Sequence, residues 1–164
     1  NTIVNTYGYL YNWAAVMNGS LSDNAVPSGV QGICPTGWHV PSDAEWTALT
    51  NFVRSQSQYC CSSNASYIAK ALASSVGWNS YLYFGAECVP GKYFENNDAT
   101  GFSAVPAGNY YYTFNSLGYV AYFWSTTEYN SICAYRRTIE YSNTGVYRHQ
   151  SEKEFGHTVR CLRD

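Results

Sequence analysis

Charged side chains are scarce in this sequence, and those of positive sign are the scarcest. Asp, Glu, Lys and Arg make up 12% of the 164 residues, about half of the usual quarter. Lys and Arg number 9 against 11 Asp and Glu, which gives a formal charge of -2. Because nucleic-acid binding relies on clustered Lys and Arg that neutralise phosphates, this composition disfavours a nucleic-acid partner. No run of about 18 apolar residues occurs either, so we expect no direct membrane span.

Patterns typical of metal and redox sites are also missing. The chain has no C-x-x-C motif, and Cys60 and Cys61 are adjacent, which favours structural disulfides over zinc binding or redox activity. His39 precedes a predicted helix start and is interpreted as a structural hydrogen-bonding residue. His149 and His157 have no nearby pattern that would orient and activate a nucleophile. We therefore expect no enzymatic activity, no metal and no cofactor.

The cysteines that are present indicate an exported protein. Six Cys against one Met are typical of chains that fold in an oxidising compartment. Six thiols allow fifteen pairings, and the spacing alone does not choose among them. The sequence begins at Asn1 without Met or an apolar signal segment, so we interpret it as a mature or excised piece whose targeting sequence was removed.

Tyrosine is the largest excess. The chain has 17 Tyr, so Tyr alone outnumbers Lys and Arg together. Tyr supplies rigid contact area at low entropic cost, and Ser, Gly and Asn supply adaptable hydrogen bonds, which is the composition of antibody paratopes. Many Tyr can instead pack at the rim of a small sheet with their hydroxyls in water. We assign the packing role to Tyr7, Tyr9, Tyr11 and Tyr122, and a binding role to Tyr129, Tyr135 and Tyr147.

Periodicity in the first two thirds predicts one strand, two helices and a long loop. Residues 7–13 are aromatic with near period-two character and predict a strand. Ser42 and Glu45 form an S-x-x-E capping box, and the apolar face that follows predicts a helix to about Arg54. A second helix is predicted over residues 65–75. The Gly, Pro and Asn residues that follow, to about residue 108, predict loops.

The last third predicts an antiparallel sheet. Strands are expected at residues 119–126, 134–141, 145–148 and 157–162. Alternation within the second of these strands places Arg137 and Ile139 on one face and Arg136, Thr138 and Glu140 on the other. One face is expected to be buried and the other free to vary. Two early helices and a late sheet predict a single α+β domain over residues 1–164.

Several strings in the sequence match a known family. They are YGYLYNW at 7–13, GICPTGWHVPSDAEW at 32–46, GFSAVPAG at 101–108, AYFWSTTE at 121–128 and VRCLRD at 159–164. Together they resemble the Fibrobacter major paralogous domain family, bacterial exported domains with a C-type-lectin-like fold. The resemblance spans nearly the whole chain. It implies an α+β, C-type-lectin-like fold with two helices, a small twisted antiparallel sheet and long loops.

Many members of this family are similar to the variable proteins of diversity-generating retroelements, in which a C-terminal segment is rewritten at template adenines. The resemblance implies a variable segment at about residues 129–155. Its constant positions would correspond to Ala134, Arg137, Ile139, Tyr141, Val146, Arg148 and Lys153. The candidate ligand-binding residues, with Tyr111 as part of a side wall, are Tyr129, Asn130, Ile132, Cys133, Tyr135, Arg136, Thr138, Glu140, Asn143, Tyr147, His149, Gln150, Ser151, Glu152 and Tyr111.

The same resemblance suggests how the cysteines pair. Cys34 and Cys161 lie in two of the matching strings, and we expect them to form a disulfide. Cys60 or Cys61 is expected to pair with Cys88, around the second predicted helix. Cys133 is then the unpaired thiol, within the variable segment.

These observations predict a surface-displayed ligand-binding domain, an adhesin or receptor-binding module, diversified in its C-terminal third. We expect it at a bacterial outer surface, at a pilus tip or on a phage tail. Its partner would be a protein or a glycan on another cell or surface. Calcium-dependent sugar binding is disfavoured because the Glu-Pro-Asn, Gln-Pro-Asp and Trp-Asn-Asp signatures are absent. The alternative is a structural or interaction module of a larger surface protein, with a fixed partner and no diversification.

Overall fold

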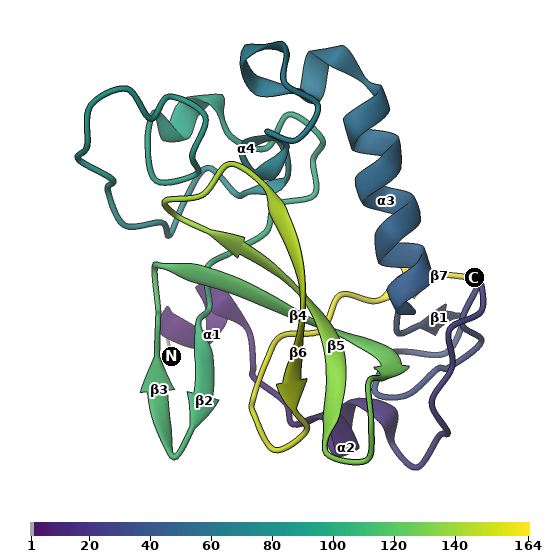
Figure 1. The fold of residues 1–164 in the computed structure, drawn as a ribbon. Coiled ribbons are helices and arrows are strands. Elements are labelled where there is room, and N and C mark those ends of the chain that lie inside the picture. The colour runs from purple at the N-terminus through teal and green to yellow at the C-terminus, as the bar shows by residue number, and fades with distance from the viewer. Residues whose placement is uncertain (1) are drawn as a thin grey trace.

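A long helix packs against a three-stranded antiparallel sheet in the computed structural model, which describes residues 2–164 (Figure 1). The helix, α3 (Asp43–Ser55), begins at the predicted capping box. Glu45 N donates to Ser42 Oγ at 3.1 Å, and Ser42 N donates to Glu45 Oε2 at 2.9 Å. These bonds satisfy N–H groups that have no partner within the helix. The predicted start and the predicted end near Arg54 are confirmed.

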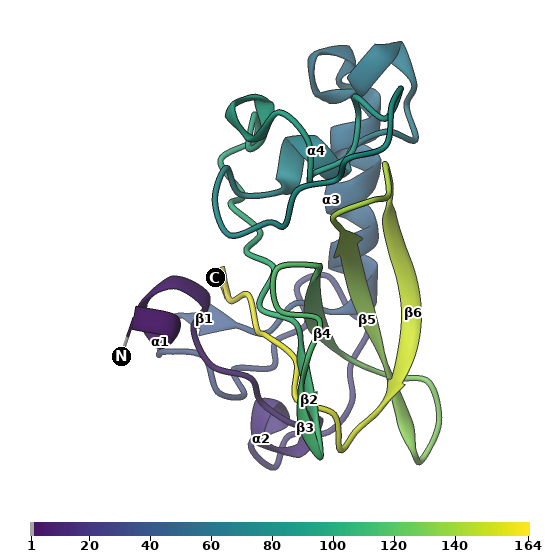
Figure 2. The same ribbon diagram turned by 90° about the vertical axis from the view of Figure 1, so that its left-hand side faces the viewer.

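The central sheet has the strand order β4-β5-β6, and both neighbouring pairs are antiparallel. Its strands are β4 (Val120–Glu128), β5 (Cys133–Glu140) and β6 (Val146–Glu152). They confirm three of the predicted strands, with β6 longer than expected. A bulge between Trp124 and Glu128 shifts the register of β4. Helix α3 contacts β4 and β5, and Figure 2 shows it behind the sheet.

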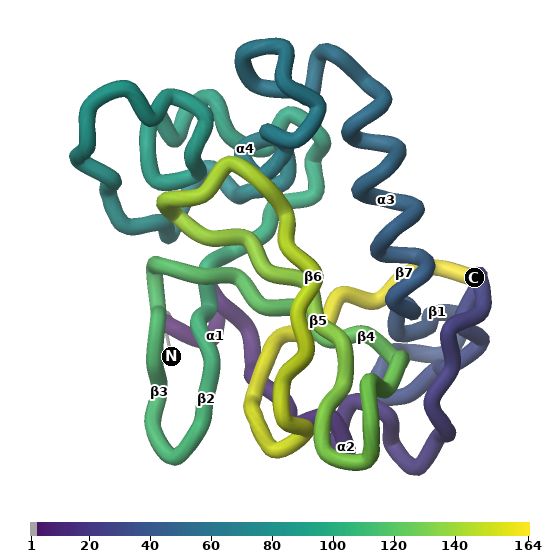
Figure 3. The backbone as a smooth tube through the Cα atoms, viewed as in Figure 1, coloured from purple at the N-terminus to yellow at the C-terminus, as the bar shows by residue number. Residues whose placement is uncertain are grey.

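Two pairs of short strands accompany the central sheet. They are β1 (Trp38–His39) with β7 (Leu162–Arg163), and β2 (Asn109–Tyr111) with β3 (Thr113–Asn115). After β6 the chain turns back along β4, where Thr158 N donates to Tyr122 O and Trp124 N donates to Thr158 O, both at 3.1 Å. Figure 3 traces this segment from β6 to β7. The strand predicted at 157–162 is therefore interrupted, and only its end forms regular β7.

The prediction of a strand at residues 7–13 is wrong. This part of the chain forms helix α1 (Thr2–Tyr7), a linker and helix α2 (Trp13–Met17). Gly8, at a φ of 74°, follows α1 directly. The Asn12 side chain then accepts from Ala15 N at 2.9 Å and caps α2, a local bond that competes with strand formation. Within this stretch, Tyr11 alone forms a β-bridge, an isolated antiparallel one to His157.

The second predicted helix is much shorter than expected. Helix α4 (Ala69–Leu72) replaces the span 65–75, after the 3-10 turns η1 (Ser57–Tyr59) and η2 (Cys61–Ser63). Asn64 is not the N-cap of α4, and its side chain accepts from Ser66 N at 2.9 Å within a turn. Ala73 leaves the helix to form a bridge with Ala104. The following loops to residue 108 agree with the prediction, with η3 (Phe94–Asn96) as their one helical turn among the described residues.

Two hydrophobic clusters lie on opposite faces of the sheet. Consecutive residues of a strand point to opposite faces, so Phe123 and Trp124 enter different clusters. Phe123 packs with Trp46 of α3, at 5.4 Å between ring centroids. Trp124 is fully buried in the other cluster, with Trp13 and Val16 of α2. The sheet is therefore held between the α3–α4 side and the α2 side of the molecule.

Two disulfides connect distant parts of the chain. Cys34 pairs with Cys161, as the family resemblance implied. The second disulfide joins Cys88 to Cys61 and not to Cys60. The Cys60 thiol points instead toward the C-terminal carbonyls of α3, with Sγ 3.4 Å from Gln56 O and 3.5 Å from Arg54 O. Cys60 and Cys133 are the free cysteines of the described chain.

The disulfides also bear on the environment of the protein. Such bonds persist in oxidising compartments, and two of them in one small domain are typical of an extracytoplasmic setting. Within residues 2–164, no helix has the length and apolar character needed to cross a bilayer. The described architecture, with few helices and small antiparallel sheets, agrees with the predicted α+β class.

Candidate functional site

The three central strands present two faces with different surroundings. Antiparallel partners point to the same face, and the register places Thr138 between Tyr122 and Tyr147. Arg136 and His149 form the next row of this face. We name the face opposite α3 the open face, defined by Tyr122, Arg136, Thr138, Glu140, Tyr147 and His149. In Figure 2, where α3 lies behind the sheet, this face is turned toward the viewer.

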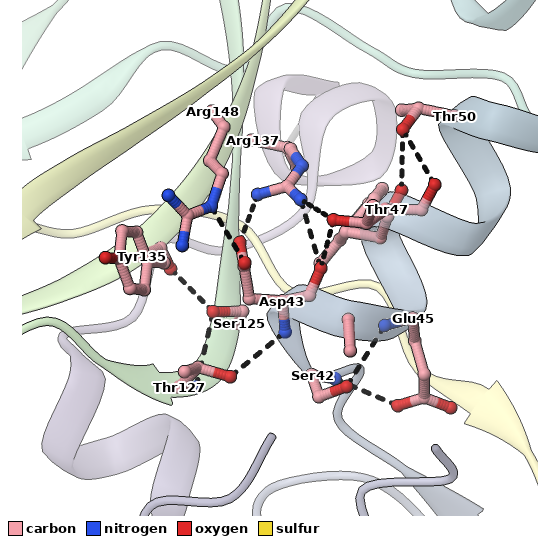
Figure 4. A network of polar contacts seen from close by, with 12 residues as sticks. Ser42, Asp43, Glu45, Thr47, Thr50, Ser125, Thr127, Tyr135, Arg137 and Arg148 are labelled. Carbon is pink, nitrogen blue, oxygen red and sulfur yellow. Dashed lines mark hydrogen bonds and ion pairs between the residues drawn. The ribbon is translucent and has the colours of Figure 1, made fainter. Parts of the chain in front are cut away.

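A buried polar network occupies the other face, which we name the helix face (Figure 4). Asp43, in the first turn of α3, is 5% exposed and lies between two arginines. Arg137 donates from Nη1 to Asp43 Oδ1 and from Nη2 to the Asp43 carbonyl at 3.0 Å. Arg148 donates from Nε to Asp43 Oδ2 at 2.8 Å. One carboxylate therefore holds the start of α3 against both β5 and β6.

Threonine hydroxyls complete this network. Arg137 Nη2 donates to Thr47 Oγ1 at 2.8 Å, and Asp43 N donates to Thr127 Oγ1 at 3.0 Å. A buried ion pair is retained only where its remaining polar atoms are also bonded, as they are here. The network is a structural anchor. No sequence pattern indicates the role of Asp43, because this residue lies 94 positions from Arg137 and no local signal connects them.

Arg136 dominates the open face. Its guanidinium carbon lies 4.6 Å from the centroid of the Tyr122 ring, and Nη1 donates to Thr138 Oγ1. Nε is buried without a hydrogen-bond partner among residues 2–164. Burial lowers the pKa of the Arg136 guanidinium from its ordinary value, and the nearby Tyr122 and Glu140 offset only part of this effect. The side chain is a partly buried cation with few protein partners.

Tyr147 and His149 form the outer edge of the open face on β6. Tyr147 is 38% exposed, and its ring is stacked on that of His149 at 6.1 Å between centroids. On β5, Glu140 is half-buried and accepts from Asn143 Nδ2 at 2.5 Å. Asn143 thus positions the acidic side chain beside the open face. Aromatic, acidic and basic groups meet here within three neighbouring strands.

Thr138 is the one candidate that the structure removes from direct contact. The sequence analysis placed it on a face free to vary, but its side chain is buried, with 1% of its surface exposed. The residue lies between Tyr122 and Tyr147, and its hydroxyl accepts from Arg136. Neighbours on three strands therefore cover it. Thr138 forms the floor of the open face and supports Arg136.

The sequence predicted one contact face, but the remaining candidates do not all lie on the open face. Strand alternation places Cys133, Tyr135, Gln150 and Glu152 on the helix-face side of β5 and β6. Tyr129 and Ile132 are exposed in the turn between β4 and β5, at 53% and 65%. In the same turn, Asn130 Oδ1 accepts from Ile132 N at 2.9 Å and Cys133 N at 2.7 Å. Asn130 thus shapes the turn.

Tyr111 and Ser151 have specific structural partners. Tyr111, on β2, is stacked on Phe155 with ring centroids 4.1 Å apart, whereas its neighbour Tyr112 is 83% exposed. Ser151 Oγ lies 3.0 Å from His157 Nε2, a pairing that no sequence pattern indicated. Burial, followed by the charge of Arg136, lowers the pKa of His157 to about 3. Such an imidazole is too weak a base at neutral pH to activate the serine hydroxyl.

His39 makes the structural hydrogen bonds that the sequence predicted. Nδ1 lies 2.7 Å from Asp164 Oδ1, and Nε2 lies 2.9 Å from Glu45 Oε1. Although burial lowers the pKa of His39, hydrogen bonds to Asp164 and Glu45 raise it above the ordinary value overall. Both ring nitrogens are engaged, so the residue joins the end of the chain to the capping box of α3.

Two cavities lie away from the open face. A cavity of about 720 Å³ lies between α1 and the β2–β3 hairpin and is lined by Val4, Tyr7, Tyr110, Phe114 and Leu117, among others. A second cavity, of about 460 Å³, is lined by the loops around Cys60 and Lys70. Within the described part of the chain, no group of three His, Cys, Asp or Glu side chains could hold a metal ion.

Comparison with known proteins identifies a family. The chain has no significant match among curated proteins or among solved structures. The family described as the Fibrobacter succinogenes major domain matches residues 2–163, which is almost the entire sequence. This match agrees with the strings singled out in the sequence and with the disulfide between two of them, Cys34–Cys161. The chain therefore belongs to the Fibrobacter succinogenes major domain family.

Proposed function

We propose that this protein is a surface-displayed ligand-binding domain, an adhesin or receptor-binding module, and that the open face is the centre of its contact surface. The observation that carries the proposal is that successive side chains of β5 and β6 point to opposite faces of the sheet. Arg137, Ile139 and Val146 point toward α3 and the core. Arg136, Tyr147 and His149 alternate with them and reach the opposite face. Side chains on that face can change without disturbing the anchor.

The chemistry of the open face suits macromolecular recognition. Tyr and Arg are enriched at binding hot spots, because they combine large apolar area with polar ends. Tyr147 is partly exposed, and Arg136 is paired with His149 in the neighbouring row of the same face. The exposed turn with Tyr129 and Ile132 extends the surface at one end of the same strands. These groups form a mixed aromatic and polar surface of the kind found in paratopes.

The proposal includes a C-type-lectin-like fold. Supporting features are the pairing of β1 with β7 and the Cys34–Cys161 disulfide beside it, which join the first third of the chain to its end. The long loops between α4 and β2 are a further point of agreement with the expected architecture. A crystal structure of the domain that superposes on calcium-dependent lectins would test this assignment.

Diversification of the C-terminal segment is the part of the proposal that genomic sequence can test. We expect a reverse transcriptase gene near the coding sequence. We also expect a near-repeat of the region encoding Ala121 to Arg163 that differs at adenines. The absence of both would favour the alternative, a non-diversified interaction module of a larger bacterial surface protein. The proposed location is the cell surface, a pilus tip or a phage tail.

The contact surface is tested by binding to protein and glycan arrays. We expect a Tyr147→Ala, His149→Ala double variant to lose about tenfold or more in affinity for any ligand found, because both exposed rings lie on the open face. The matched control is Tyr83→Ala, which removes a 73% exposed ring from a distant loop. Unchanged binding by the double variant would show that the open face is not the contact surface.

A further inference from the structure

We infer that Arg136 receives a carboxylate of the ligand, and that this carboxylate is an Asp or Glu side chain of a protein partner. The inference deepens the proposed function and rests on it, because it names the chemistry that the open face selects. The starting observation is that N–H groups of the Arg136 guanidinium make no hydrogen bond within residues 2–164.

The other arginines around the sheet show what Arg136 lacks. Arg137 is bonded to the carboxylate and carbonyl of Asp43 and to Thr47. Arg148 is bonded to the second oxygen of Asp43. Arg160, which is partly buried, donates from Nη2 to Phe102 O at 2.8 Å. Arg137 and Arg148 therefore have a carboxylate acceptor, and Arg160 has a backbone carbonyl acceptor.

Arg136 has a single neutral acceptor. Its guanidinium carries five N–H donors, and its one hydrogen bond among residues 2–164 is from Nη1 to the Thr138 hydroxyl. Nε is buried and unbonded, whereas the residue as a whole is only partly buried. Buried charges are normally paired because desolvation is costly. A ligand carboxylate that reaches the Nη atoms would supply the missing acceptor.

The nearby acidic side chain does not fill this role. Glu140 is close enough to influence Arg136 electrostatically, but its carboxylate is bonded to Asn143 Nδ2 and makes no hydrogen bond to the guanidinium. The other titratable groups of this face are Tyr122, Tyr147, His149 and His157. Glu140 repels each negative charge of a ligand, so it disfavours a polyanion more than a single carboxylate.

The shape of the open face favours a protein as the source of the carboxylate. Sugar and small-molecule sites are usually concave, and the two cavities of about 720 and 460 Å³ are lined by other parts of the chain. The exposed part of the open face is the edge strand β6 with Tyr147 and His149, and an exposed aromatic turn lies at one end of the sheet. An acidic side chain on a flat partner can reach Arg136 while the rings contact the surface around it.

The test is an NMR titration of the wild-type protein, in which the Nε–Hε signal of Arg136 is followed. We expect sodium acetate to shift this signal saturably, relative to sodium chloride at equal ionic strength. An acetyl-Gly-Glu-Gly-amide peptide should do the same, and the peptide with Gln in place of Glu should not. The Arg160 signal is the internal control, because its guanidinium already has a carbonyl acceptor. No acetate-dependent shift of Arg136 would overturn the inference.

Two variants and one competitor sharpen the result. Glu140→Gln should strengthen acetate binding several-fold by removing a like charge, whereas Arg136→Gln should weaken it about tenfold or more. Weaker acetate binding by Glu140→Gln would count against the inference. If N-acetylneuraminic acid bound more tightly than the Glu peptide, the protein source would be wrong. The titration needs no natural partner, so its outcome is independent of the array experiment on Tyr147 and His149.

Discussion

At the scale of single residues, His157 shows how the chain beneath the open face controls its electrostatics. The ring is 1% exposed and lies 4.8 Å from Tyr122 and 4.5 Å from Trp124, between centroids. Burial and the charge of Arg136 keep it neutral. A neutral imidazole leaves Arg136 as the principal positive charge at the centre of the face, which the proposed carboxylate requires.

This environment predicts a pH dependence of stability. The pKa of His157 falls from 6.5 to about 3 on folding, so the unfolded chain binds the proton more tightly. The contribution of neutral His157 to the free energy of unfolding is complete above pH 6.5 and is lost as the pH falls toward 3. We expect wild type to lose about 3 kcal/mol more than His157→Phe between pH 7 and pH 4. Urea unfolding at both pH values measures this difference.

Wild type and His157→Phe contain the same carboxylates, so a difference between the pH dependences of their stability comes from His157. His149→Phe, on the exposed strand β6, controls for the addition of an aromatic ring. Identical pH dependence in wild type and His157→Phe would contradict the burial of a neutral imidazole.

At the scale of elements, the contact between α3 and the sheet depends on Asp43. We expect Asp43→Asn to lower the free energy of unfolding by about 3 kcal/mol, because it leaves Arg137 buried without its ionic partner. Equilibrium denaturation with urea measures the loss. Glu87→Gln is the control, since it breaks a more exposed ion pair with Lys92 at 3.2 Å and should cost less than about 1 kcal/mol. Equal losses would show that Asp43 is not the anchor.

The contact between Asp43 and Arg137 also affects which residues of the open face can be substituted without loss of folding. Asp43 and Arg137 hold β5 from the helix face, so the strand is supported without help from the side chains of the open face. Substitutions at Arg136, Tyr147 or His149 should therefore change binding more than folding. Thr138 is the exception, since its buried hydroxyl supports Arg136.

At the scale of the whole molecule, the Cys34–Cys161 disulfide closes the chain on itself. It spans 127 residues, whereas Cys61–Cys88 spans 27. The loop-entropy model predicts that removing the longer link costs about 1.4 kcal/mol more than removing the shorter one. Urea unfolding of Cys34→Ser/Cys161→Ser and of Cys61→Ser/Cys88→Ser tests this order. A larger loss in the free energy of unfolding for Cys61→Ser/Cys88→Ser would contradict this order. Non-reducing peptide mapping of the wild type checks both disulfide pairings beforehand.

Features encoded within a few residues were predictable from the sequence. The capping box at Ser42 and Glu45 defined the start of α3, and alternation along residues 134–141 separated Arg136 from Arg137. The matching strings pointed to the family that covers residues 2–163. Even so, local signals misled at Tyr7 to Trp13, where Asn12 caps a helix instead of joining a strand. Alternating aromatic residues alone do not favour a strand strongly enough to outweigh the capping of α2 by the Asn12 side chain.

Only the tertiary structure decided which side chains are available for contact. Thr138 and Glu140 occupy equivalent positions of the alternation, yet Thr138 is covered by neighbours on two other strands. The choice of Cys61 over Cys60 and the pairing of Asp43 with Arg137 likewise depend on atoms that meet across long sequence separations. The sequence by itself determined the family, the α+β class, helix α3 and the three strands of the central sheet, because matching strings, capping and periodicity are local signals. Burial, ion pairing and the identity of the open face followed from packing between segments that are distant along the chain.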